Sequence, residues 1–239
     1  HGGGVHAAVP RGGHDLPRGQ RCVRADADAD TVPLLGFVPY GPEMFIHLRS
    51  ADLFVLPTLS PDYKTIDEEA IRADVKNSIR HGVMGTVLYP VGVNPDQHNQ
   101  VIKIICDEAK GTKLLPGDII GGTSEAADMD HLAAIENIGL THLLVSLDRS
   151  GICKTEEELY LKYKKRIEAT KLPCFLFAMV NPWYAKFGPS GIPIRVFDKL
   201  ADLPNVVGIK FSQPMNLATA FQCCEAFADR LSIGVVNLD

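Results

Sequence analysis

The sequence lacks several of the patterns that identify common classes of protein. Its eight histidines show no HxH or HExxH spacing, so nothing in the sequence supports a metal site. Its six cysteines form neither a CxxC pair nor a spaced framework, which favours reduced thiols inside a cell. No apolar run approaches the roughly 18 residues of a membrane span, and the first residues do not have the order of a secretory signal. We therefore predict a cytoplasmic protein without a metal, a cofactor or a membrane partner.

Charge of one sign is also scarce. The 24 basic and 29 acidic residues are spread along the chain and give a net charge of -5. Without a basic stripe the sequence does not predict nucleic-acid binding, and without an acidic block it does not predict an interaction tail. A hydrophobic content of 46% and a mean hydropathy of +0.03 are those of a globular protein with a sizeable core. The expected partner is a small molecule.

The first 51 residues differ from the rest of the chain. Residues 1–31 are rich in Gly, His, Arg and Asp and show no apolar periodicity, which predicts a disordered leader or an artefact of the gene model. The arginines are compatible with an organelle transit peptide, but the repeated Asp residues argue against one. Residues 32–51 form an irregular apolar segment broken by prolines and glycines, and the sequence assigns it no role.

From residue 52 to residue 239, short apolar runs alternate with amphipathic stretches, as in successive βα units with a parallel sheet. The predicted strands are Leu53–Leu56, Gly85–Tyr89, Asp118–Gly121, His142–Leu147, Cys174–Met179, Val206–Phe211 and Ser232–Val236. Capping chemistry marks three predicted helix starts, at Thr65, Asn94 and Thr155.

The spacing of these strands favours a TIM (β/α) barrel. Strands begin about 30 residues apart, which is the repeat of such a barrel. A doubly wound open sheet is the competing architecture, but it normally carries a glycine fingerprint after its first strand, and Pro57-Thr58-Leu59-Ser60-Pro61 stands there instead. Because a closed barrel needs eight strands and the pattern gives seven, we predict a barrel that lacks the eighth strand and the C-terminal helices.

Lys210 is the residue that points most clearly to chemistry. It lies in the middle of the run 204–212, where strand alternation places it on one face with Gly208 and Ser212. These small neighbours leave room for a ligand beside the amine. Imine formation requires a neutral amine, and burial lowers the pKa of a lysine side chain. The alternative interpretation of the local pattern is a lysine near a strand end whose ammonium reaches solvent.

Other candidates at the predicted carboxyl ends of the strands are weaker. Tyr89 and Tyr184 each offer a phenol for proton transfer, although a tyrosine in such a place often serves packing alone. The run Gly121-Gly122-Thr123-Ser124 has the composition of a turn whose N–H groups hold a phosphate or carboxylate. The same run also suits a tight turn into a helix.

Two stretches of the sequence match a known family. They are Leu172-Pro173-Cys174-Phe175-Leu176-Phe177, followed by an Asn-Pro turn, and Leu203-Pro204-Asn205-Val206-Val207-Gly208-Ile209-Lys210. Ile119-Ile120-Gly121-Gly122-Thr123 and Asn94-Pro95-Asp96-Gln97-His98 support the match. Through them the chain, roughly from residue 52 to 239, resembles the pyruvate-dependent class I aldolases that include dihydrodipicolinate synthase and N-acetylneuraminate lyase. The resemblance implies a TIM barrel whose Lys210 forms a Schiff base with the keto carbon of pyruvate or another 2-oxo acid. It also implies a homo-oligomer such as a tetramer.

The chain departs from the family pattern at several places. The family usually has a tyrosine on its fifth strand, where this chain has Phe177, and often a Pro-Tyr-Tyr turn after the fourth strand, where it has Asp148-Arg149-Ser150-Gly151. The family's carboxylate-binding loop after the second strand is shortened here, directly after Tyr89. Tyr89 or Tyr184 is then the candidate substitute for the missing phenols.

These inferences define one leading function and two alternatives. The leading prediction is a Schiff-base aldolase or lyase that acts on a 2-oxo acid. Its predicted catalytic residues are Lys210, Tyr89 and Tyr184, and its predicted substrate contacts are Thr123, Phe177 and Ser212. The first alternative is an impaired or non-catalytic family member that retains only the lysine. The second is a phosphate-binding barrel of another kind, which the 121–124 turn would permit.

Overall fold

A computed structural model describes residues 52–62, 64–121, 124–146, 153–179, 181–188, 191–212 and 217–235. The predictions for the leader and for the irregular apolar segment concern residues 1–51 and lie outside the described residues, and so does the predicted site residue Thr123.

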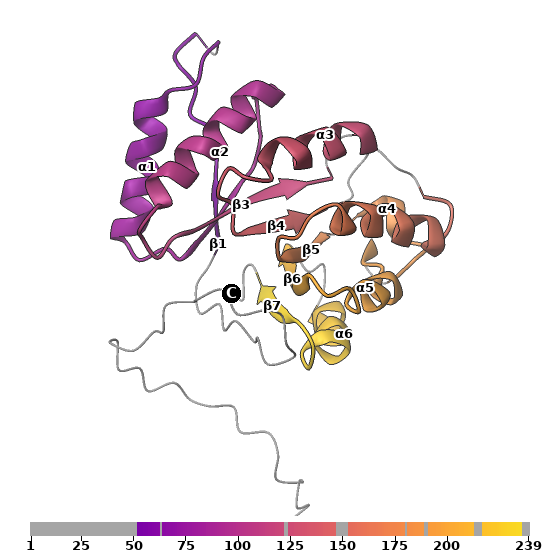
Figure 1. The fold of residues 1–239 in the computed structure, drawn as a ribbon. Coiled ribbons are helices and arrows are strands. Elements are labelled where there is room, and N and C mark those ends of the chain that lie inside the picture. The colour runs from indigo at the N-terminus through magenta and orange to yellow at the C-terminus, as the bar shows by residue number, and fades with distance from the viewer. Residues whose placement is uncertain are drawn as a thin grey trace, which may run out of the picture. The chain divides into compact units, whose positions relative to one another are not determined.

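Seven parallel strands form one sheet in which each strand pairs with its neighbours in sequence (Figure 1). The strands are β1 (Asp52–Val55), β2 (Gly85–Leu88), β3 (Leu115–Ile120), β4 (His142–Val145), β5 (Cys174–Met179), β6 (Val206–Ser212) and β7 (Ser232–Val235). A doubly wound sheet would change direction at a switch point. The unbroken order β1 to β7 excludes that alternative and agrees with a TIM-barrel-like α/β fold.

Helices follow the strands in regular alternation. They are α1 (Glu68–Arg80), α2 (Pro95–Ala109), α3 (Glu125–Ile135), α4 (Glu156–Glu168), α5 (Ile194–Leu200) and α6 (Leu217–Phe227), with a short 3-10 helix, η1, at Pro182–Tyr184. Asn94 caps α2 with the reciprocal capping box that the sequence predicts, and Thr155 caps α4. The prediction of Thr65 as the cap of α1 is wrong: Asp67 is the cap, and its carboxylate accepts from Ala70 N–H.

The third strand also differs from its prediction. It begins at Leu115 rather than at Asp118. Pro116, within the strand, lacks an N–H and cannot donate a hydrogen bond to a neighbouring strand. Its carbonyl nevertheless accepts from the N–H of Thr141 at 2.8 Å, so the strand still bonds to the neighbouring chain segment there.

The two faces of the sheet have different partners. One face packs against the helices and carries the main core, in which β-strand residues such as Leu143, Leu176 and Ile209 meet helix residues such as Val75 and Ile167. The other face, which we call the inner face, has a separate small cluster made of Val87, Leu144 and Phe177, packed with Ile119 and Phe175. By strand register, Lys210 lies on this inner face.

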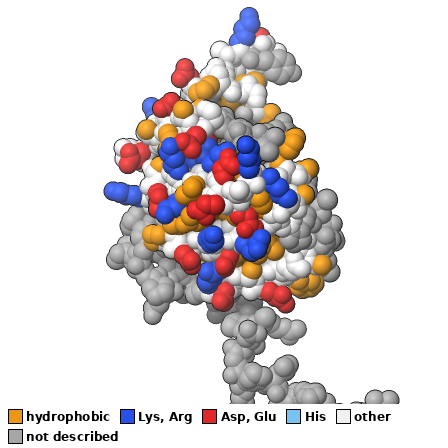
Figure 2. All heavy atoms as spheres, turned by 90° about the vertical axis from the view of Figure 1, so that its right-hand side faces the viewer, with side chains coloured by type: hydrophobic (Ala, Val, Ile, Leu, Met, Phe, Trp, Pro, Cys, Tyr) orange, Lys and Arg blue, Asp and Glu red, His pale blue; other side chains and the backbone are white. Residues whose placement is uncertain are grey.

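The described part of the chain shows no patch of one charge on the face in Figure 2 and no disulfide. Figure 2 shows one face of the molecule, on which acidic and basic side chains are interspersed. The five cysteines in the described part of the chain are free, and burial raises the pKa of Cys174 and of Cys223 to about 12. Among the described residues, no helix combines the length and the apolar character needed to cross a membrane.

Candidate active site on the inner face of the sheet

Lys210 lies in the middle of β6 and is buried, with 6% of its surface exposed. Its register partners are Phe177 on β5 and Gly234 on β7. Burial disfavours the charged ammonium, so this position is suited to an amine that must react in its neutral form. The alternative of an ammonium that reaches bulk water from a strand end does not agree with this burial.

Close packing leaves no room for a side chain at Gly208, two residues before Lys210 on the same face of β6. A Cβ at Gly208 would lie 2.5 Å from Cδ1 of Phe175 and 2.8 Å from the carbonyl oxygen of Ser232. The Phe175 ring contacts the His142 ring edge to face, with centroids 5.7 Å apart, and the His142 ring in turn occupies the space above Gly117. These rings pack against the inner face on the amino-terminal side of Lys210, and Nζ of Lys210 is itself buried.

Asn205, in the run that carries the family resemblance, has a structural role. Its side-chain Nδ2 donates to three carbonyl oxygens ahead of β5, those of Ile167 (2.9 Å), Thr170 (3.2 Å) and Leu172 (3.4 Å). Its own carbonyl accepts from Cys174 N–H at 2.7 Å. The asparagine therefore fixes the start of β5 against the start of β6, and the register shifts by one residue directly after Cys174, which pairs Phe177 with Lys210.

The structure brings three of the predicted site residues to one place. Phe177 is buried beside Lys210 on the inner face, and Ser212, half-buried, ends β6 on the same face, in register with Met179. Sequence reasoning missed Ser146, which is buried directly after β4 and continues the inward alternation of Leu144. That alternation could have identified it.

The two candidate phenols occupy different environments. Tyr89 directly follows β2, with 43% of its surface exposed, and its N–H donates to the carbonyl of Val55. Tyr184 is buried in η1 and packs with Phe187 in the core on the helix-covered face. Phe177 belongs instead to the inner-face cluster. The predicted role of each tyrosine as a proton relay stays a prediction.

The turn after β3 is held from within the protein. Gly121 adopts a φ of 101°, and its N–H donates to Oδ1 of Asp128 at 3.3 Å. Ser124 caps α3 by accepting from Ala127 N–H. Because the carboxylate of Asp128 already accepts from the Gly121 N–H, this donor is not directed at an outside anion. The phosphate-binding alternative stays a prediction, since residues 122 and 123 of the turn lie outside the described residues.

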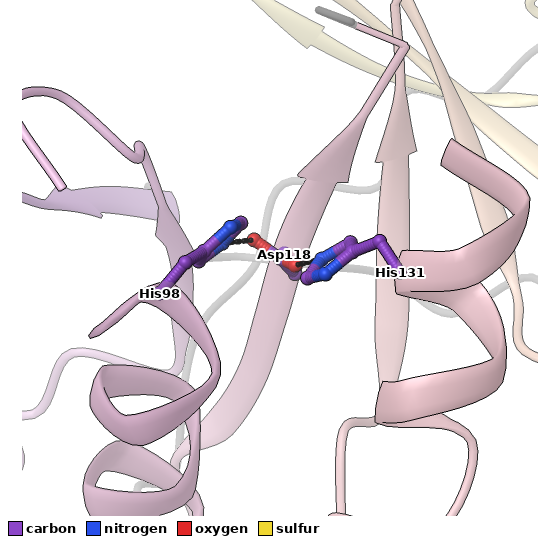
Figure 3. Close-up of side chains that lie close together, drawn as sticks. All are labelled: His98, Asp118 and His131. Atoms are coloured by element: carbon purple, nitrogen blue, oxygen red, sulfur yellow. Dashed lines mark hydrogen bonds and ion pairs between the residues drawn. The ribbon is translucent and has the colours of Figure 1, made fainter. Parts of the chain in front are cut away.

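A second group of polar side chains lies on the helix-covered face of β3 (Figure 3). Asp118 is completely buried, and His98 of α2 and His131 of α3 approach it from opposite sides. Nε2 of His98 lies 3.0 Å from Oδ1, and Nε2 of His131 lies 2.7 Å from Oδ2. Burial alone would raise the pKa of Asp118, but the hydrogen bonds from His131 and His98 outweigh it, and the pKa is lowered. The carboxylate is therefore ionised.

Short histidine motifs such as HxH or HExxH could not reveal this group. The three residues are separated by 20 and 13 positions and come from three different elements. Only the β3 register and the packing of α2 and α3 bring them together, so no local spacing could have identified the group.

Comparisons with known proteins add to this geometry. No family model matches the chain. Among curated proteins it is 28% identical over 178 residues to a 4-hydroxy-tetrahydrodipicolinate synthase of Phenylobacterium zucineum, covering 70% of this chain and 57% of that protein. It is 34% identical over 98 residues to the enzyme of that name from Dehalococcoides mccartyi, covering 41% and 30%. The chain thus spans between about a third and three fifths of the length of these two relatives.

Solved structures show the same fold. Dihydrodipicolinate synthase from Aquifex aeolicus superposes with a TM-score of 0.66 at 17% identity, covering 79% of this chain and 63% of that one. N-acetylneuraminate lyase from Fusobacterium nucleatum gives a TM-score of 0.64 at 15% identity, covering 77% and 62%. In sequence the chain is similar to these 4-hydroxy-tetrahydrodipicolinate synthases, and its fold is similar to that of the solved dihydrodipicolinate synthase and N-acetylneuraminate lyase.

Proposed function

We propose that this protein forms a Schiff base between Lys210 and the keto carbon of pyruvate or another small 2-oxo acid. The observation that carries the proposal is the buried position of Lys210 in the middle of β6, on the inner face beside Phe177. Relatives named for an aldol-type synthase and a lyase support a carbon–carbon bond reaction.

The chemistry follows from the amine. Neutral Nζ attacks C2 of the 2-oxo acid to give a carbinolamine, and uptake of one proton with loss of water gives the protonated imine. The imine nitrogen accepts the electron pair of a C3–H bond when a base removes that proton, and this gives an enamine. The enamine carbon then attacks an aldehyde, or the reverse reaction cleaves the bond, and water releases the product and restores the amine. The proposed substrate contacts are Ser212, which ends β6, and Ser146, which directly follows β4.

The family resemblance assigns proton transfer to a tyrosine at the position of Phe177, and a phenylalanine ring cannot perform it. This observation favours a second candidate, a family member that forms the imine but turns over slowly. Loss of one general acid–base group typically costs about 10² to 10⁴ in rate. Tyr89 remains the proposed substitute because it directly follows β2, at the same carboxyl edge of the sheet toward which β6 runs.

Exchange of the methyl protons of pyruvate for deuterium tests the proposal without a second substrate. We expect the protein to accelerate this exchange in D2O, followed by proton NMR, because the imine acidifies C3. The Lys210→Met variant keeps the volume of the side chain and should exchange no faster than buffer. Lys199→Met, at an exposed lysine of α5, is the matched control and should keep the full rate. Equal rates in the two variants would refute the assignment to Lys210.

A barrel without an eighth strand, a homo-oligomer and a cytoplasmic location stay predictions.

A further inference from the structure

The group His98, Asp118 and His131 has the composition and the geometry of a metal-binding site. The potential ligand atoms, one from each residue, all lie within 4.8 Å of one another. The side chain of Asp118 has no exposed surface, while those of His98 and His131 are 11% and 15% exposed. The imidazole rings are stacked, with centroids 4.5 Å apart and planes inclined by 22°. Both imidazoles present the same atom, Nε2, to the carboxylate.

We propose that His98, Asp118 and His131 bind a divalent transition-metal ion, with Zn²⁺ as the fitting ion. Two imidazole nitrogens and one carboxylate are a donor set that Zn²⁺ takes in proteins, with a water in the fourth position. The partly exposed edges of the two imidazoles leave a route for that water. Mg²⁺ and Ca²⁺ prefer all-oxygen sets and fit less well.

On binding, the metal ion replaces the hydrogen bonds between the two histidines and Asp118. In the structure, Nε2 of each imidazole lies within hydrogen-bond distance of a carboxylate oxygen, so a neutral imidazole carries its proton on Nε2. To bind a metal through Nε2, each ring moves that proton to Nδ1 and stays neutral. One carboxylate oxygen then bonds to the ion, and neither oxygen accepts from the rings any longer. Such small shifts leave the positions of α2, β3 and α3 unchanged.

The site is distinct from the one at Lys210. By strand alternation Asp118 faces the helices, whereas Gly117 and Ile119 face the interior with Lys210. The ion would therefore join α2 and α3 to β3 rather than contact a substrate. Nearby Cys106, on the same helix as His98, is an unsuitable competitor, because burial raises the pKa of its thiol to about 12.

Isothermal titration with Zn²⁺ alone, on the full chain after dialysis against a chelator, tests the inference. We expect a tight site with one ion per chain, and weakening by at least about 100-fold in His131→Gln, since even neighbours of ligands change affinity by about 10- to 100-fold. His81→Gln replaces an exposed histidine after α1 and should bind as the unchanged protein does. A Zn²⁺ excess of about 100 times Kd should raise Tm by on the order of 5 °C.

Two results would overturn the inference. One is the absence of a stoichiometric site in the unchanged protein, and the other is equal affinity in His131→Gln and His81→Gln. If His131→Gln fails to fold, the Co²⁺ form of the unchanged protein decides the question. Visible d–d bands without a thiolate charge-transfer band indicate nitrogen and oxygen ligands, whereas a thiolate band would assign the metal to cysteines and contradict the proposal. These outcomes do not depend on whether Lys210 forms an imine.

Discussion

Replacing Phe177 by tyrosine is expected to raise the rate of pyruvate methyl exchange by about 100-fold or more. Phe177 is the register partner of Lys210 and belongs to the inner-face cluster, so a phenol added to its ring would extend from a side chain next to the amine. The substitution adds one oxygen to a ring that is already 7% exposed, and we expect the fold to accept it. Proton NMR in D2O, with imine formation measured in parallel, gives the rate per imine formed.

Phe175→Tyr is the matched control for this gain. Phe175 lies on the same face and the same strand, two residues earlier, which places its ring about 6.6 Å toward the amino-terminal side. A phenol there meets Gly208 and His142 rather than the substrate, so the exchange rate should not rise. An unchanged rate in Phe177→Tyr, with the imine still formed and the variant folded, would show that a missing phenol does not limit the reaction.

Replacing Asp128 by alanine is expected to lower the free energy of unfolding by about 3–5 kcal/mol. Asp128 and Arg166 have side chains that are only 4% and 2% exposed, and Oδ2 of Asp128 accepts from Nε and Nη2 of Arg166 at 2.7 and 2.6 Å. Oδ1 accepts from Gly121 N–H. The alanine would leave a buried guanidinium without its carboxylate and release the turn after β3. A loss of this size is a large part of the 5–15 kcal/mol that usually stabilises a domain.

Urea unfolding followed by circular dichroism measures this loss as a shift of the midpoint. Glu125→Ala is the control. Glu125 forms an ion pair with Lys165 between the same two helices, α3 and α4, but both side chains are about half exposed. Exposed pairs contribute about 0–1 kcal/mol, so this variant should unfold close to the unchanged protein. Replacing both members of the buried pair, as in Asp128→Leu with Arg166→Met, should recover part of the loss. Equal midpoints for Asp128→Ala and Glu125→Ala would contradict the importance of the buried pair.

The fold could be predicted from sequence where a local pattern and its surroundings agree. Cys174–Met179 is a strand with both ends as predicted, because its apolar run is bounded by Pro173 and by the Asn-Pro turn. The alternation of small and large residues also placed Lys210 and Ser212 on the same face. At Leu115 and Thr65 the sequence was misleading, since the pairing of Leu115 with Gly85 of β2 and the capping carboxylate of Asp67 decide those boundaries.

Only part of the candidate site could be predicted from the sequence, for a physical reason. Lys210 is the one charged residue in its strand, so the local pattern alone marks it as a candidate for chemistry. His98, Asp118 and His131 are unremarkable in their own elements, and only tertiary packing joins them. Ser146 was missed although the alternation of the predicted strand, continued from Leu144, gives its inward direction.

Reductive trapping with pyruvate and borohydride, followed by mass spectrometry of the peptides, tests Lys210 most directly. Hydride converts the imine into a stable amine, so the adduct marks the reacting lysine. We expect the mass of the reduced adduct on the peptide that contains Lys210, and none on that peptide in Lys210→Met. An unmodified Lys210 peptide at saturating pyruvate, or adducts confined to exposed lysines such as Lys199, would contradict the proposal that Lys210 is the imine-forming residue.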